Sequence, residues 1–222
     1  MSMLRTLNQI ENGTISSAQL DTLLADSSAL DFSSYMVGQY FPSKGGYYSG
    51  FINVSSTQRF LYFAAPVATG QSTSIQWGNY GVKTALTNLG SYTDLTSLDA
   101  LTNNGDLAYD GKYITENYLN SSTYPAGNLG ASLSITIGSN TFNDYFLPSI
   151  HELYMMYKNK TIFNTNCPVA EQWNTSNYYW SSTEYYTITN AWGLYFYGGT
   201  LYTSNKGTNA FARVVRKYAL AI

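Results

Sequence analysis

Few residues of this 222-residue chain combine the type and the spacing that catalysis requires. His151 is the only histidine, and no serine or cysteine motif stands near it that would complete a nucleophilic triad. We expect it in the first turn of a helix, where it faces solvent or caps the helix. Cys167 is the only cysteine, so an intrachain disulfide and a cysteine-based metal cluster are both excluded. The sequence therefore predicts no catalytic residue.

Oxygen-bearing side chains that a calcium ion could accept gather in one short segment. They come from Asn103, Asn104, Asp106 and Asp110. Their spacing matches no EF-hand loop, and the glycines at 105 and 111 are typical of ordinary turns. Since a calcium site needs about six converging oxygens, we expect neither a metal nor another cofactor.

Two arginines stand in a terminal segment that is otherwise apolar. If this segment is a strand, Arg213 or Arg216 must bury its guanidinium group. A buried guanidinium needs a carboxylate or several carbonyl oxygens. We expect Glu152 or Glu184 to supply that carboxylate, in a structural role.

The composition is rich in tyrosine and poor in charge. Tyrosine occurs 22 times, whereas charged residues make up only 11% of the chain. Tyrosine offers a large rigid face and a hydroxyl group at little entropic cost, as adhesive surfaces require. The alternative for any single tyrosine is that it fills a strand face. The net charge of −2 and the lack of a Lys/Arg cluster argue against nucleic-acid binding.

No segment is predicted to enter or cross a membrane. The densest apolar run, residues 60–68, is too short to span a bilayer and contains Pro66. Residues 1–11 lack the basic and apolar regions of a secretory signal. We expect a protein that stays in a cytoplasm or is assembled there into something larger.

The elements that must position these residues begin with helices. Residues 1–36 show apolar residues at helical spacing and a capping box at Ser16 and Gln19. Their apolar face needs a partner, either the domain that follows or another chain. From residue 37 the sequence consists of short aromatic and β-branched runs separated by turn residues. These runs predict a β-meander with strands at 38–41, 47–54 and 59–65.

Helices are expected next, at 93–101 and at 114–119, the second capped by Asp110 or Thr115. Residues 121–141 contain too many Gly, Ser and Asn residues to assign an element, although Leu133, Ile135 and Ile137 alternate as in a strand. The sharpest local signal follows Pro148, where Ser149 and Glu152 form a capping box that predicts a helix from residue 150.

The last third predicts antiparallel strands. Residues 191–197 place Trp192, Leu194 and Phe196 on one strand face, and Gly193, Tyr195 and Tyr197 on the other. The glycine pair 198–199 predicts a hairpin turn, followed by a strand at 200–203, a loop at 204–209 and a final strand at 211–218. The fold class is therefore α+β, with helices beside a small antiparallel sheet.

Several of these segments also resemble a known family. DYFLPSIHEL at 144–153, YWSSTE at 179–184, Ala191-Trp192 with Phe196 and Gly198, and RVVR at 213–216 are similar to the ordered motifs of the Lcl C-terminal-type domain. GGYY at 45–48, the run at 60–66, WG at 77–78 and DG at 110–111 with Thr115 are weaker matches. The resemblance covers residues 37–218, and the domain is expected to comprise residues 37–222. Two departures are Tyr145, where the family usually has tryptophan, and the polar insert at 118–141.

The resemblance implies a C-type lectin-like fold, related to formylglycine-generating enzymes and found in bacterial surface proteins and bacteriophages. Those enzymes depend on a pair of reactive cysteines, and a single cysteine removes the main support for that activity. The family's occurrence in bacteriophages, the lack of a secretory signal and the tyrosine-rich, low-charge composition together lead us to expect a bacteriophage virion protein. It would be a tail-fibre protein or related adhesin, assembled in the host cytoplasm. Residues 1–36 would attach it to other virion proteins. The alternative is a purely structural virion protein in the tail, the collar or the capsid.

In the lectin-like fold the loops near the C-terminal strands form the ligand-facing surface. This implies a site for a host cell-surface glycan or protein at Tyr185, Tyr186, Asn190, Tyr195, Tyr197, Tyr202, Asn205 and Asn209. The alternative is that the same tyrosines pack against a neighbouring subunit. A homo-oligomer is expected, and a trimer is favoured because fibre-like viral proteins are commonly cyclic.

Overall fold

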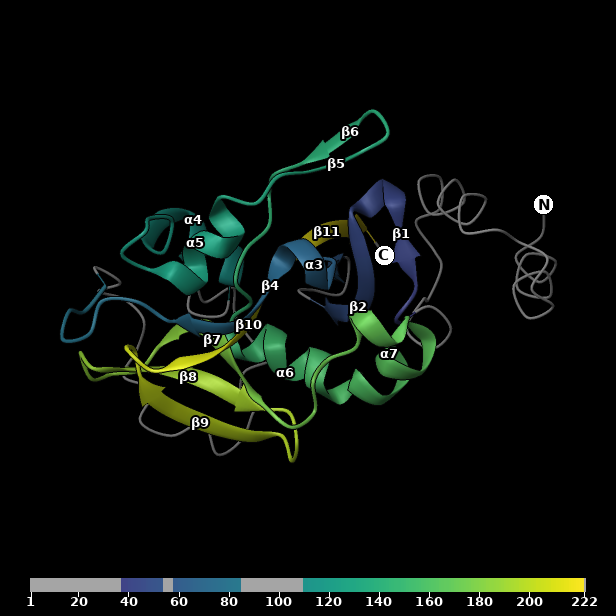
Figure 1. Cartoon of the computed structure of the whole chain (residues 1–222). Coiled ribbons are helices and arrows are strands. Elements are labelled where there is room, and N and C mark those ends of the chain that lie inside the picture. Colours follow the sequence, from purple (N-terminus) through teal and green to yellow (C-terminus); the bar gives the residue numbers. More distant parts are fainter. Residues whose placement is uncertain (1–36, 54–57, 85–109, 222) are drawn as a thin grey trace, which may run out of the picture.

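The computed structural model describes residues 37–53, 58–84 and 110–221 (Figure 1). The predicted helices within residues 1–36 and at 93–101 lie outside these residues, as do Asn103, Asn104 and Asp106. The described part is mixed α+β, mostly sheet with few helices, and the sheets are curled and largely antiparallel. The predicted fold class is confirmed at this level.

A four-stranded antiparallel sheet joins the two ends of the described chain. Its order is β1 (Tyr40–Phe41), β2 (Gly46–Asn53), β3 (Gln58–Ala64) and β11 (Val215–Ala221). A short 3-10 helix, η1 (Pro42–Lys44), connects β1 to β2. The predicted β-meander is thus confirmed. Strand β11 pairs with β3 along its whole length, from Val215 opposite Ala64 to Ala221 opposite Gln58.

A five-stranded sheet contains most of the last third of the chain. Its order is β4 (Gln71–Gln76), β10 (Asn209–Arg213), β7 (Tyr178–Glu184), β8 (Asn190–Tyr195) and β9 (Thr200–Asn205). Only the contact between β10 and β7 is parallel. The predicted turn after β8 is confirmed, and Gly199 adopts the φ of 73° that favours glycine there. A separate hairpin pairs β5 (Ile135–Ile137) with β6 (Asn140–Phe142).

The predicted final strand at 211–218 is wrong as a single element. The chain breaks at Val214, so that β10 belongs to the five-stranded sheet and β11 to the four-stranded one. Val214 donates its N–H to Gly70 O (2.9 Å) and accepts from Ala65 N (3.0 Å). These two bonds, to residues just before and at the end of helix α3 (Val67–Gly70), pair the backbone N–H and C=O of Val214 at the point where the chain passes from one sheet to the other.

The helices cover and connect the two large sheets. They are α3 (Val67–Gly70), α4 (Gly111–Tyr118), α5 (Pro125–Ala131), α6 (Ile150–Lys158), α7 (Lys160–Asn166) and the 3-10 helix η4 (Val169–Glu171). Helix α6 contacts β2 of one sheet and β7 and β8 of the other, as Figure 1 shows. Its predicted capping box between Ser149 and Glu152 is confirmed, and Asp110 caps α4. None of the described helices is both long and apolar enough to cross a membrane.

The aromatic core lies around α6 and behind the five-stranded sheet. Trp173 stacks on Phe196 with ring centroids 5.0 Å apart, and Trp192 packs in the same cluster. Trp180 belongs to a second cluster on the other face of β7, together with Trp77. Trp180 and Trp192, which both lie in family-like motifs, are buried, with exposed fractions of 0% and 7%.

Candidate binding site

Four tyrosines gather on one face of the sheet formed by β7, β8 and β9. We call Tyr178, Tyr195, Tyr197 and Tyr202 the tyrosine face. The rings of Tyr178 and Tyr202 meet edge to face with centroids 5.4 Å apart, and those of Tyr195 and Tyr197 are 6.3 Å apart. Tyr178 lies directly opposite Tyr195 on the neighbouring strand. The exposed fractions of Tyr195, Tyr197 and Tyr202 are 38%, 77% and 48%.

The alternation of side chains along β8 explains this arrangement. Trp192 and Leu194 point into the aromatic core, so Gly193 and Tyr195 point to the opposite face. Gly193 pairs with Tyr202 on one side and with Trp180 on the other. A Cβ atom added at Gly193 would come within 2.7 Å of the backbone oxygen of Tyr179. The glycine therefore keeps the sheet closely packed at the centre of the tyrosine face.

The tyrosine face presents hydroxyl groups and aromatic rings without charge. Burial raises the pKa of Tyr178, so its hydroxyl stays protonated and donates a hydrogen bond to Asn209 O at 3.5 Å. This surface suits stacking on a sugar ring or packing on an apolar patch, with hydrogen bonds at the hydroxyl tips.

A second group of predicted residues lies at the other end of β8. Asn190 pairs with Asn205, and the loop after β7 carries Tyr185 and Tyr186. Tyr185 is half-buried because its ring meets Trp192 edge to face at 5.1 Å, whereas Tyr186 is 46% exposed. The side-chain oxygen of Asn205 accepts from Gly207 N, so it helps to form its own turn.

The structure thus divides the eight predicted residues between two places. The first and last residues of β8 are about 17 Å apart at about 3.4 Å per residue. Tyr195, Tyr197 and Tyr202 lie together, and Asn209 joins them through its backbone oxygen. Tyr178 was not predicted. The alternation of side chains along β7 could have identified it. Tyr179 points into the core, so the neighbouring Tyr178 points to the opposite face of the sheet.

A buried ion pair holds the second group in place. Glu184 accepts hydrogen bonds from Lys206 Nζ, from Thr84 N at 3.0 Å and from Thr84 Oγ1 at 2.6 Å. Lys206 Nζ also donates to Val82 O at 2.7 Å and lies 5.0 Å from the ring centroid of Trp77. The side chains of Lys206 and Glu184 are only 0% and 2% exposed. Burial lowers the pKa of Lys206, and Glu184 opposes that change.

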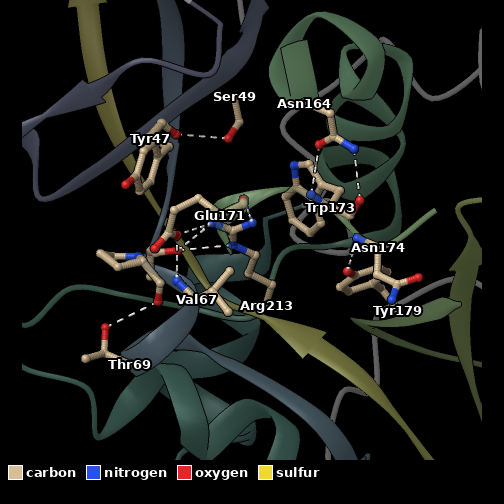
Figure 2. A network of polar contacts seen from close by, with 12 residues as sticks. Tyr47, Ser49, Val67, Thr69, Asn164, Glu171, Trp173, Asn174, Tyr179 and Arg213 are labelled. Atoms are coloured by element: carbon tan, nitrogen blue, oxygen red, sulfur yellow. Dashed lines mark hydrogen bonds and ion pairs between the residues drawn. The ribbon is translucent and has the colours of Figure 1, made fainter. Parts of the chain in front are cut away.

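The predicted burial of Arg213 is confirmed, but its predicted partner is wrong. Figure 2 shows its guanidinium group between Glu171 and the segment before α3. It donates to Ala65 O at 3.0 and 3.1 Å, to Glu171 O at 2.7 Å and to Glu171 Oε2 at 3.2 Å. Its carbon lies 4.9 Å from the ring centroid of Trp173. Glu171 is the last residue of η4, so this short helix supplies both its carbonyl and its carboxylate to the guanidinium group.

The other predicted partners are also corrected. Arg216 pairs with Asp144, with nitrogen–oxygen distances of 2.7 and 3.1 Å. Glu152 is buried and accepts from Tyr62 Oη at 3.0 Å, from Ser149 N at 2.8 Å and from Gly111 N at 3.2 Å. Burial raises the pKa of Glu152 to about 7. Among the described residues, neither Glu152 nor Glu184 pairs with an arginine.

The histidine, the cysteine and Asp110 lie in environments that indicate a structural role. His151 lies in the first turn of α6 as predicted, but it is half-buried, and burial lowers its pKa. Cys167 is buried, and burial raises the pKa of its thiol. Asp110 bonds Tyr113 N and Lys217 Nζ. Among the described residues, no group of three or more histidine, cysteine or acidic side chains could hold a metal.

No protein-family model matches the chain, and no curated protein matches it either. The family resemblance therefore rests on the motifs themselves.

Proposed function

We propose that this chain is a bacteriophage virion protein, a tail-fibre protein or related adhesin. Its C-type lectin-like domain would present the tyrosine face to a receptor on the host surface. The single observation that carries the binding role is the tyrosine face, an exposed cluster of uncharged aromatic side chains on a sheet.

The contacts between the family-like motifs support the lectin-like fold. Phe146 bridges Val215, joining the first motif to the last. Ser182 N donates to Pro148 O at 2.8 Å, which joins the second motif to the first. Motifs far apart in the sequence thus form one buried unit, as expected if they define a domain.

The rigidity of the face supports a binding role. Tyr178, Tyr195 and Tyr202 stand on paired strands, and the core behind them is aromatic and buried. Rigid aromatic side chains lose little entropy when a ligand covers them. Such sites usually have a few anchors, each contributing more than about 1 kcal/mol to binding.

The alternative is a purely structural virion protein in which the tyrosine face contacts another subunit. An uncharged aromatic surface suits the core of a subunit interface equally well. A formylglycine-generating activity gains no support from a cysteine that is buried and has a raised pKa.

Alanine variants of Tyr195 and Tyr202 in the tyrosine face, together with Tyr186 in the second group, separate the two roles. We expect them to lower adsorption of assembled particles to host cells, with melting temperature and particle assembly unchanged. Tyr218→Ala is the matched control, since Tyr218 is 39% exposed but belongs to the four-stranded sheet. If assembly fails while adsorption per assembled particle is normal, the face is a subunit interface.

Electron microscopy of purified particles with a labelled antibody tests the location. Exposure at the distal end of the tail supports the adhesin. A position at an internal joint supports the structural alternative, and absence from the particle contradicts both.

A further inference from the structure

Among the described residues, strand β9 is an edge of the five-stranded sheet. It pairs with β8 on one side, without a bulge, from Asn190 opposite Asn205 to Tyr195 opposite Thr200. On its other side it has no strand partner in the described part of the chain (Figure 1). Its sequence, TLYTSN, contains no charged residue and no proline. A regular, uncharged edge of this kind readily accepts another strand.

The other edges of the two large sheets carry features that prevent such pairing. Strand β1 has two residues and is followed by Pro42. Strand β11 carries Arg216 and Lys217. Strand β4 pairs with β10 through a register shift and contacts α5. Short strands, charges, bulges and covering helices are the usual protections, and β9 shows none of them within the part of the chain that the structure describes.

We propose that β9 pairs antiparallel with β9 of a second copy of this chain, across a two-fold axis. The homo-oligomer is then a dimer and not the trimer that is favoured from the sequence. A strand without charge can lie against itself without repulsion, and a two-fold axis satisfies both copies with the same surface. This goes beyond the proposed function, because the pairing uses the backbone groups along the edge of β9 and not the tyrosine rings, although Tyr202 of the tyrosine face stands on this strand.

Backbone geometry restricts the register. In an antiparallel sheet, successive residues direct their N–H and C=O groups to opposite neighbours, so every second residue of β9 points outward. Two copies must pair residues of this same set, so one residue lies opposite its own copy and the axis passes midway between the two. The two longest registers pair residues 200–204 with Tyr202 opposite its copy, or residues 201–205 with Thr203 opposite its copy.

The axis stands perpendicular to the sheet, so both copies show the same face on the same side. The two tyrosine faces then become neighbours on one continuous sheet. A dimer would engage two receptor sites at once, which raises the effective affinity without any new contact to the receptor.

Light scattering during size-exclusion chromatography of the full chain tests the pairing. Over a dilution series we expect a dimer of twice the chain mass of 24.6 kDa. Thr203→Lys places like charges at or beside the axis in either register, and we expect it to give a monomer. Thr73→Lys is the matched control on β4, the opposite edge of the same sheet, and should remain dimeric.

A monomer or a trimer of the unmodified chain would overturn the proposal, as would a dimer that Thr73→Lys dissociates and Thr203→Lys does not. Hydrogen exchange provides a second measurement that needs no variant. Amides of residues 200–205 should become more protected as protein concentration rises. Protection that does not depend on concentration would also refute the pairing.

Discussion

Replacing Lys206 with methionine should strongly destabilise the fold. The change keeps most of the side-chain volume but removes the ammonium group that faces Glu184 and Val82 O. Glu184, whose side chain is only 2% exposed, would keep only the two donors of Thr84. The carboxylate would then be buried without a counter-charge.

The expected cost follows from this burial. Removing one partner of a buried ion pair costs about 3–5 kcal/mol, because the remaining charge is left uncompensated. This is a large part of the roughly 5–15 kcal/mol by which domains are stable.

Urea denaturation followed by tryptophan fluorescence measures the free energy of unfolding. The double variant Lys206→Met with Glu184→Gln removes both charges and should recover much of the stability lost in the single variant. Lys112→Met is the matched control, since Lys112 and Glu116 form an exposed pair at 3.7 Å. Exposed pairs contribute only about 0–1 kcal/mol.

Two results would refute the reasoning. One is a loss below about 1 kcal/mol in Lys206→Met, the value expected of an exposed pair. The other is a double variant no more stable than the single one, which would mean that lost packing rather than uncompensated charge explains the effect.

Three further predictions concern the core, a buried carboxyl and the N-terminal segment. Trp180→Ala and Trp192→Ala should each cost about 3–5 kcal/mol in urea denaturation, and a loss below about 1 kcal/mol would contradict their burial. Because burial raises the folded-state pKa of Glu152 to about 7, stability should fall as pH rises from about 4.5 to about 7. Glu152→Gln should remove this dependence in denaturation at pH 5 and pH 8, and an unchanged dependence would assign it to other groups. Removing residues 1–32 should leave a folded domain that no longer joins the particle, and an unfolded product by circular dichroism would place them in the core.

Local signals in the sequence predicted local structure well. The capping box at Ser149, the cap at Asp110 and the turn at Gly199 each depend on residues within one turn of the chain. The alternation along β8 also predicted which side chains enter the core, because one face of that strand packs on α6.

Long-range pairing could not be predicted in the same way. Arg213 needed a carboxylate, but several were available, and only the turn of η4 brings Glu171 to it. Glu184 was assigned to an arginine, although Lys206 reaches it from the turn after β9. The division of the last strand at Val214 depends on Gly70 and Ala65, which lie far away in the sequence.

The pairing of β3 with β11 also has a consequence for how the protein is made. Val215 pairs with Ala64, so about 150 residues separate the two strands in the sequence. On a ribosome, β3 therefore emerges long before its partner is synthesised, and loops of this length close slowly. We expect slow folding that is completed only after β11 has left the exit tunnel. Until then, β3 is an aromatic strand with one open side, and a chaperone that shields it would raise the yield of folded protein.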